Sequence, residues 1–194
     1  MTAAKTKPKW LDSLEQFDPC SEALLWAKKH PTAAAAWKAC HRGDWMLWIV
    51  GKVQCGEPES DERKRLVLCA CECARLALPI WEARYPSDKR VARCIETAER
   101  WARGEATINE LRTARETADA AADAAAAAAA YAAAAAAADA DADADAAAYA
   151  AAAAAADADA DADADAAAYA ARAKTLSQCA DIVRKHYPTP PKPQ

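Results

Sequence analysis

The chain has 194 residues, with eight cysteines, seven tryptophans and a formal net charge of −4. This length allows one domain with an appendage, and the opening MTAAKTKPKW lacks the apolar core of a secretory signal. No long run of strongly apolar residues occurs, so we expect no membrane span, a cytoplasmic location and reduced thiols.

The charge is distributed unevenly along the chain. Residues 116–171 hold eleven aspartates and one glutamate with no lysine or arginine, a charge of −12, whereas residues 1–115 and 172–194 each carry +4. Such an acidic segment repels nucleic acid and membrane surfaces and attracts basic proteins. We therefore expect no direct nucleic-acid binding.

Three short helices are predicted after a basic leader. Ser21 opens the first, which ends near His30, and Thr32 caps the second, which stops at Arg42. Asp44 is predicted to cap the third, over residues 45–50 (WMLWIV). Because that segment is apolar on every side, it is interpreted as the central buried helix.

Two longer helices follow. The first is predicted over residues 61–78, with Pro79 as its stop, and Ser87 is predicted to cap the second, which Gly104 ends. The second is amphipathic, with apolar positions at Val91, Cys94 or Ile95, Ala98, and Trp101 or Ala102. Thr107 and Glu110 then form a capping box at the start of a further helix.

An alanine-rich tract continues from this helix. It contains no glycine or proline, and its aspartates fall mostly in two alternating Asp-Ala runs. Each aspartate is less favourable in a helix than alanine by roughly half a kcal/mol, and like charges four residues apart repel, so the runs are the weakest points of a helical region. We interpret the tract as a partner-binding surface. Its predicted partner-binding residues are Asp139, Asp141, Asp143, Asp145, Asp157, Asp159, Asp161, Asp163, Asp165, Tyr131, Tyr149 and Tyr169.

The C-terminal segment carries an apolar stripe that needs a partner. Its members are Leu176, Cys179, Ile182, Val183 and Tyr187. A straight helical rod would leave this stripe far from the tryptophan-rich part of the chain. Reversal at an aspartate run would bring it back, and dimerisation would also cover it. We favour the reversal.

The predicted fold is therefore all-α. A helical bundle body is joined to a long alanine-rich helical region that folds back as a hairpin. The predicted divisions are a disordered leader (1–9), a tryptophan-rich helical body (10–115), the low-complexity tract (116–171), a C-terminal helix returning to the body (172–188) and a proline-rich tail (189–194).

No residue pattern indicates an enzyme, a cofactor or a metal site. Cys69, Cys71 and Cys73 alternate, which differs from the spacing of zinc knuckles, so we interpret them as buried small hydrophobes. The histidines (His30, His41 and His186) lie at predicted helix ends, where we expect helix capping or solvent exposure rather than catalysis. Glu72 is expected to pair with an arginine such as Arg75. No phosphate-binding loop or Ser-His-Asp arrangement occurs.

Several blocks resemble a known family. They are residues 42–52 (RGDWMLWIVGK), 66–79 (LVLCACECARLALP), 95–111 (IETAERWARGEATINEL) and 179–188 (CADIVRKHYP). Together they are similar to the helical immunity proteins linked to bacterial polymorphic toxins, which also occur in phage and metagenomic sequences. That family has an Ala/Tyr-rich tract of variable length between the last two blocks, with more tyrosine and with aspartates that are scattered rather than alternating. The resemblance implies an all-helical fold and neutralisation of a toxin, and it supplies no catalytic residues.

The function we predict is a non-enzymatic immunity-type protein that neutralises a toxin or nuclease by steric or electrostatic occlusion, with a basic protein as its partner. One alternative is a structural protein that self-associates as a homo-oligomer through its alanine-rich helices. Another is an acidic mimic of nucleic acid in phage anti-defence.

Overall fold

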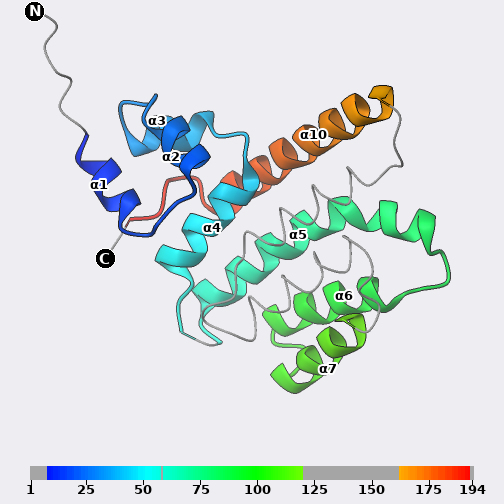
Figure 1. Ribbon diagram of the computed structural model, residues 1–194. Helices are drawn as coiled ribbons and strands as arrows, with labels where there is room; N and C mark the ends of the chain where they lie inside the picture. Colours follow the sequence, from blue (N-terminus) through cyan, green and yellow to red (C-terminus); the bar gives the residue numbers. More distant parts are fainter. Residues whose placement is uncertain (1–7, 58, 120–161, 193–194) are drawn as a thin grey trace, which may run out of the picture.

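The described part of the chain is built from helices and loops. The computed structural model describes residues 8–57, 59–119 and 162–192, and no strand occurs among them (Figure 1). The predicted all-helical class is confirmed, whereas the path of residues 120–161 lies outside the described residues. The helices are α1 (Lys9–Glu15), α2 (Ser21–Ala27), α3 (Ala33–Ala39), α4 (Gly43–Gln54), α5 (Asp61–Arg84), α6 (Arg90–Ala102), α7 (Ile108–Asp119) and α10 (Ala162–His186).

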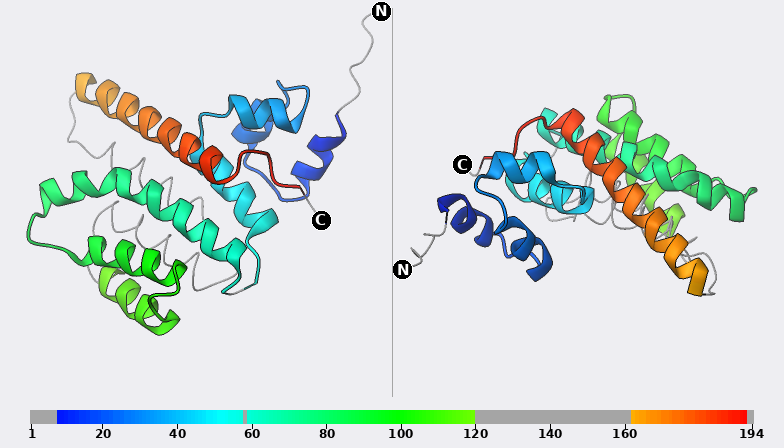
Figure 2. Two further views of the ribbon diagram at one scale, coloured as in Figure 1. Left: turned by 180° about the vertical axis from the view of Figure 1, so that it is seen from behind. Right: turned by 90° about the horizontal axis from the view of Figure 1, so that it is seen from above.

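Helix α5 occupies the centre of the bundle. Helix α6 packs along it and α7 packs on α6, while α4 and α10 contact both α5 and each other (Figures 1 and 2). The fully buried residues of α5 are mostly small, among them Cys69, Ala70, Cys71 and Cys73. Small side chains let neighbouring helices approach α5 closely on more than one side.

The prediction that residues 45–50 form the central helix is therefore wrong. Met46, Leu47 and Val50 of α4 are buried, but Trp45, Trp48 and Ile49 are only half-buried. The predicted cap is also wrong, because α4 begins at Gly43 and places Asp44 inside its first turn. A helix that is apolar on all sides is predicted to be buried all round. The sequence does not show which of its side chains are fully buried in the core and which are only partly covered.

Helix α5 also continues beyond its predicted end. Pro79 lies inside the helix, which runs on to Arg84. Proline cannot donate the helical hydrogen bond to the carbonyl of Arg75, a defect that costs about 3 kcal/mol in a helix interior. Leu78 and Trp81 are buried on either side of it, and each buried apolar side chain contributes about 1.5–3 kcal/mol. Tertiary packing thus outweighs the local defect.

Helices α6 and α7 follow the predicted pattern closely. The predicted apolar face of α6, including Val91, Ile95 and Trp101, is buried. The capping box of α7 is present, since the Thr107 N–H donates to Glu110 Oε2 at 2.7 Å and the Glu110 N–H donates to Thr107 Oγ1 at 3.2 Å. At the start of α6, however, it is Asp88 rather than Ser87 whose side chain accepts a backbone N–H, that of Arg90 at 3.0 Å.

Helix α10 returns the C-terminal segment to the bundle. It packs against α4 and α5 and runs antiparallel to α5 (Figures 1 and 2). Leu176, Cys179, Val183 and Tyr187 from the predicted stripe are buried, and Ile182 is partly buried. The helix begins at Ala162, earlier than the predicted C-terminal helix, because alanine-rich sequence favours continued helix.

Helix α3 is fastened to the end of α10. The Trp37 indole Nε1–H donates to the carbonyl of Tyr187 at 2.9 Å. Arg184 Nη1 donates to the carbonyls of Trp37 at 3.2 Å and Cys40 at 2.7 Å, close to the C-terminal end of α3. A cation is favourable at a helix C-terminus, so these bonds hold α3 on the end of α10.

The described helices include none whose length and apolar character would suffice to cross a membrane.

Candidate functional site

The predicted acidic site is only partly within the described residues. Asp163, Asp165 and Tyr169 lie in the first turns of α10. Those turns are at the end of the molecule opposite α1–α3 in every view (Figures 1 and 2). The other predicted residues lie outside the described residues; they are Asp139, Asp141, Asp143, Asp145, Asp157, Asp159, Asp161, Tyr131 and Tyr149.

Both ends of the acidic tract are held by the bundle. Ala118 near the end of α7 is buried in the core, and so are Thr175 and Leu176 on α10. The carboxylates between these points are therefore tethered to a folded body at two places. The two segments that flank the tract are thus fixed on the bundle.

A polar cluster joins α5 to the last turn of α10. Glu72 accepts hydrogen bonds from Lys185 Nζ at 3.0 Å, and His186 Nε2 lies 2.8 Å from Glu72 Oε1. The pairing predicted between Glu72 and Arg75 is wrong, because Arg75 binds Glu99 of α6, with 2.7 Å between Nη2 and Oε2. Partial burial of Glu72 opposes its charge, but the hydrogen bonds from Lys185 and His186 outweigh burial and lower its pKa.

Replacing Glu72 by glutamine should destabilise the protein only above about pH 4. A carboxylate whose pKa is lowered in the folded state stabilises that state above its unfolded pKa, and the stabilisation is lost as pH falls through the folded pKa. The side chain is 37% exposed, so we expect a loss of at most about 1 kcal/mol at pH 7. Urea unfolding of E72Q and wild type at pH 7 and pH 3 measures this.

The matched control is Glu116→Gln, an exposed carboxylate on α7. It should leave the unfolding midpoint nearly unchanged at both pH values. An E72Q deficit as large at pH 3 as at pH 7 would show that the cluster does not act through the Glu72 charge.

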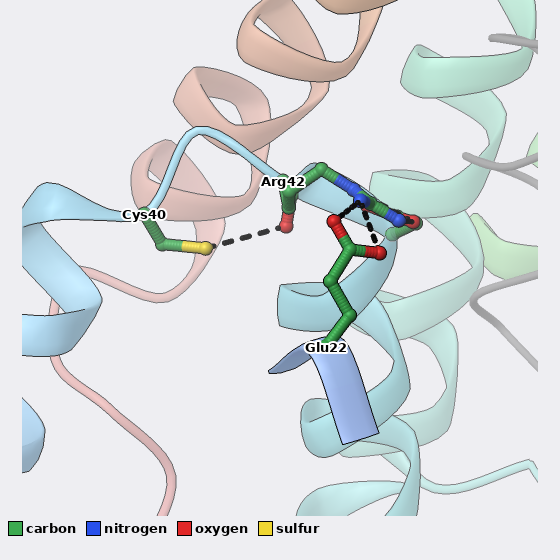
Figure 3. Close-up of polar contacts among 4 residues, drawn as sticks. Glu22, Cys40 and Arg42 are labelled. Atoms are coloured by element: carbon green, nitrogen blue, oxygen red, sulfur yellow. Dashed lines mark hydrogen bonds and ion pairs between the residues drawn. The ribbon is translucent and has the colours of Figure 1, made fainter. Parts of the chain in front are cut away.

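A second polar cluster lies where α2 meets the start of α4 (Figure 3). Arg42 Nη2 donates to Asp44 Oδ2 at 2.6 Å and Nη1 donates to Glu22 at 3.3 Å. The bond with Asp44 raises the pKa of Arg42, so the guanidinium stays charged. Arg42 also lies 4.2 Å from the ring centroid of Trp45, and its carbonyl accepts a hydrogen bond from Cys40 Sγ. We interpret this cluster as a structural contact between α2 and α4, because its charged groups already bind one another.

The three cysteines of α5 are buried small side chains, as predicted. Cys69, Cys71 and Cys73 of α5 and Cys179 of α10 are fully buried. Burial raises the pKa of Cys71, and hydrogen bonding with Cys179 and Cys69 together with burial raises that of Cys73. The raised pKa values keep the thiols of Cys71 and Cys73 protonated at neutral pH, and these two groups are therefore poor nucleophiles. Among the described residues, no group of three or more histidine, cysteine or carboxylate side chains is placed to hold a metal ion.

The histidines differ in their surroundings. His30 contacts the Trp26 ring with 4.3 Å between centroids, His41 is exposed, and His186 belongs to the Glu72 cluster. Two of the three therefore make contacts that the prediction of helix capping or solvent exposure did not include.

An apolar cavity among the described residues was not predicted from the sequence. Its volume is about 570 Å³, and it lies between α1–α3, α4 and the C-terminal tail. Five of the seven tryptophans, together with Phe17, line it: Trp10, Trp26, Trp37, Trp45 and Trp48. The concentration of tryptophan in the first 48 residues is a sequence signal for this region, which the prediction assigned to the helical body without a cavity.

Comparison with known proteins identifies one relationship. A family model described as "Imm-5 like putative immunity protein" matches residues 56–185, which is more than half of the chain. No curated protein and no solved structure matches the chain. The matched residues include α5, α6 and α7 and nearly all of α10.

Proposed function

Because this chain belongs to the Imm-5 like family of immunity proteins, we propose that it is a non-enzymatic protein that binds and neutralises a toxin or nuclease. Family membership is the observation that carries the proposal. In this mode of action the bundle acts as a scaffold, and inhibition results from covering a surface of the toxin. No catalytic step is required of the chain.

We further propose that the toxin presents a basic surface to the acidic tract. Residues 116–171 carry a charge of −12, and both ends of the tract are anchored on the bundle. Charge concentrated in this way attracts an oppositely charged partner and can raise association rates by about 10- to 1,000-fold at low ionic strength. Bound toxin would be held beside the bundle, which adds steric exclusion to the charge attraction.

Replacing the nine aspartates of the two runs by asparagine should weaken capture of the partner without unfolding the body. A salt-gradient pull-down from the source lysate compares this variant with wild type. We expect wild type to retain a basic protein that salt releases, and the variant to release it at much lower salt. Association rates with the captured protein should fall about 10- to 1,000-fold at low ionic strength.

Two controls separate charge from structure. The body's thermal unfolding should be nearly unchanged in the asparagine variant, since asparagine and aspartate have similar helix propensities. A variant with Tyr131, Tyr149 and Tyr169 replaced by phenylalanine keeps the charge and should retain the salt profile.

If the asparagine variant captures the same protein with the same salt profile, the acidic tract is not the binding surface. Capture by neither form would favour the self-associating structural alternative.

A further inference from the structure

The apolar cavity shares no residue with the segment proposed to meet the toxin. Every residue that lines it falls within residues 10–53 or 189–192, outside the family-matched residues 56–185. It also lies at the end of the molecule that carries α1–α3, whereas the first turns of α10 project from the opposite end (Figure 2). The immunity function therefore assigns the cavity no role.

The size and walls of the cavity are those of a small-molecule site. Its volume of about 570 Å³ falls within the range of roughly 300–1,000 Å³ that ligand pockets occupy, and such pockets are mostly apolar and aromatic. The tryptophans come from all four of its helices, so aromatic surface faces it from several directions.

The polar groups of the lining indicate the chemistry of the ligand. Ser13, Thr32 and Thr189 supply hydroxyl groups, and Lys192, which is exposed on the C-terminal tail at the mouth of the cavity, is the one charged residue among the described lining residues. No carboxylate belongs to the described lining. An apolar ligand with a single negative group therefore matches the walls, since the cation has no opposite charge beside it within the lining.

Two walls of the cavity, α1 and α2, are held by few buried residues. Helices α1 and α2 each bury a single residue, Leu11 and Ala27 respectively. The indole Nε1–H of Trp10 is buried without a hydrogen-bond partner, which further destabilises the observed position of α1. Segments with few buried contacts open locally at low free-energy cost. Helix α1 is thus the wall that we expect to open.

We propose that this cavity binds an apolar monocarboxylic acid, with its hydrocarbon part among the tryptophans and its carboxylate beside Lys192. Bound ligand would fill the space between α1–α3 and α4 and hold α1 against the bundle. Ligand binding of this kind is linked to stability, so occupancy should raise the unfolding temperature.

Titration of the intact protein with octanoate, decanoate and dodecanoate tests the proposal. Tryptophan fluorescence and calorimetry should report binding that tightens about fourfold for each added methylene, as expected for roughly 0.8 kcal/mol per buried CH₂. The corresponding alcohols should bind more weakly at each chain length. Absence of saturable binding by all three acids, or equal affinity for acid and alcohol, would overturn the proposal.

Two variants locate the site. Ala23→Phe places a large side chain in the lining of α2 and should abolish binding, whereas Ala39→Phe, exposed on α3 and outside the lining, should not. Lys192→Gln should weaken acid binding about two- to fivefold and leave alcohol binding unchanged. Unaltered acid binding by Ala23→Phe would contradict the assignment.

Hydrogen exchange on the wild-type protein gives a measurement that does not depend on the folding of any variant. Dodecanoate should protect the amides of α1 and α2, and unchanged exchange in both would contradict the proposal. Protection of α1 by the captured toxin, with no acid binding, would instead identify the cavity as a protein-docking surface. Capture of the basic partner is measured separately, so failure of one proposal leaves the other standing.

Discussion

Gly43→Ala is expected to lower the free energy of unfolding by about 3 kcal/mol. A Cβ at position 43 would contact Cys179 Cβ and lie 2.6 Å from the backbone nitrogen of Ala180 and 2.7 Å from the Cys179 carbonyl carbon. Backbone atoms cannot move aside as a flexible side chain can, so α4 and α10 would have to separate. The gain in helix propensity from glycine to alanine, up to about 1 kcal/mol, is smaller than this cost. Chemical denaturation followed by circular dichroism measures the difference.

Gly104→Ala is the matched control for this substitution. A Cβ at position 104 would meet no atom within 4 Å, and the cost of about 1–2 kcal/mol comes only from the left-handed backbone, with φ of 78°. The double variant Gly43→Ala with Cys179→Gly should remain less stable than wild type because the backbone contacts persist. A Gly43→Ala variant no less stable than Gly104→Ala would show that α4 and α10 do not approach this closely.

Val183→Asp is expected to cost more than about 4 kcal/mol and to release α10 from the bundle. Val183 is fully buried in the core that α10 shares with α4 and α5. An aspartate there would lose its hydration without gaining a partner cation. Denaturation midpoints and limited proteolysis of the C-terminal segment measure the two effects.

The control for Val183→Asp introduces the same charge at an exposed position of the same helix. Lys174→Asp changes the charge of α10 on its solvent side and should shift the midpoint little. If Val183→Asp unfolds near the wild-type midpoint and its C-terminal segment resists protease, the docking of α10 described above is incorrect.

The predictions that the structure confirms depend on short-range chemistry. The Thr107–Glu110 capping box requires only residues three apart, and the buried face of α6 requires only a helical period. The apolar stripe on α10 likewise requires only a helical period. In each of these cases the local pattern agrees with the packing around it.

The predictions that failed required knowledge of neighbouring elements. Pro79 ends a helix in isolation, but the burial of Trp81 on the core keeps α5 helical past it. Asp44 resembles an N-cap in the sequence. In the structure its carboxylate instead accepts a hydrogen bond from the guanidinium of Arg42, two residues earlier. The cavity was not predictable, because a sequence pattern distinguishes apolar from polar residues but not filled from empty space.

The attachment of α3 to α10 also determines when this protein can complete its fold. The bonds of Trp37 and Cys40 reach residues 150 and 144 positions later in the chain, and contacts between such distant residues slow folding. During synthesis, Gly43 and Met46 of α4 are present long before the Cys179 and Arg184 that cover them. At about 5–20 residues per second, that interval is on the order of ten seconds on the ribosome. The nascent chain therefore exposes apolar surface until its last helix emerges, and any chain terminated before α10 is a substrate for chaperones and proteases.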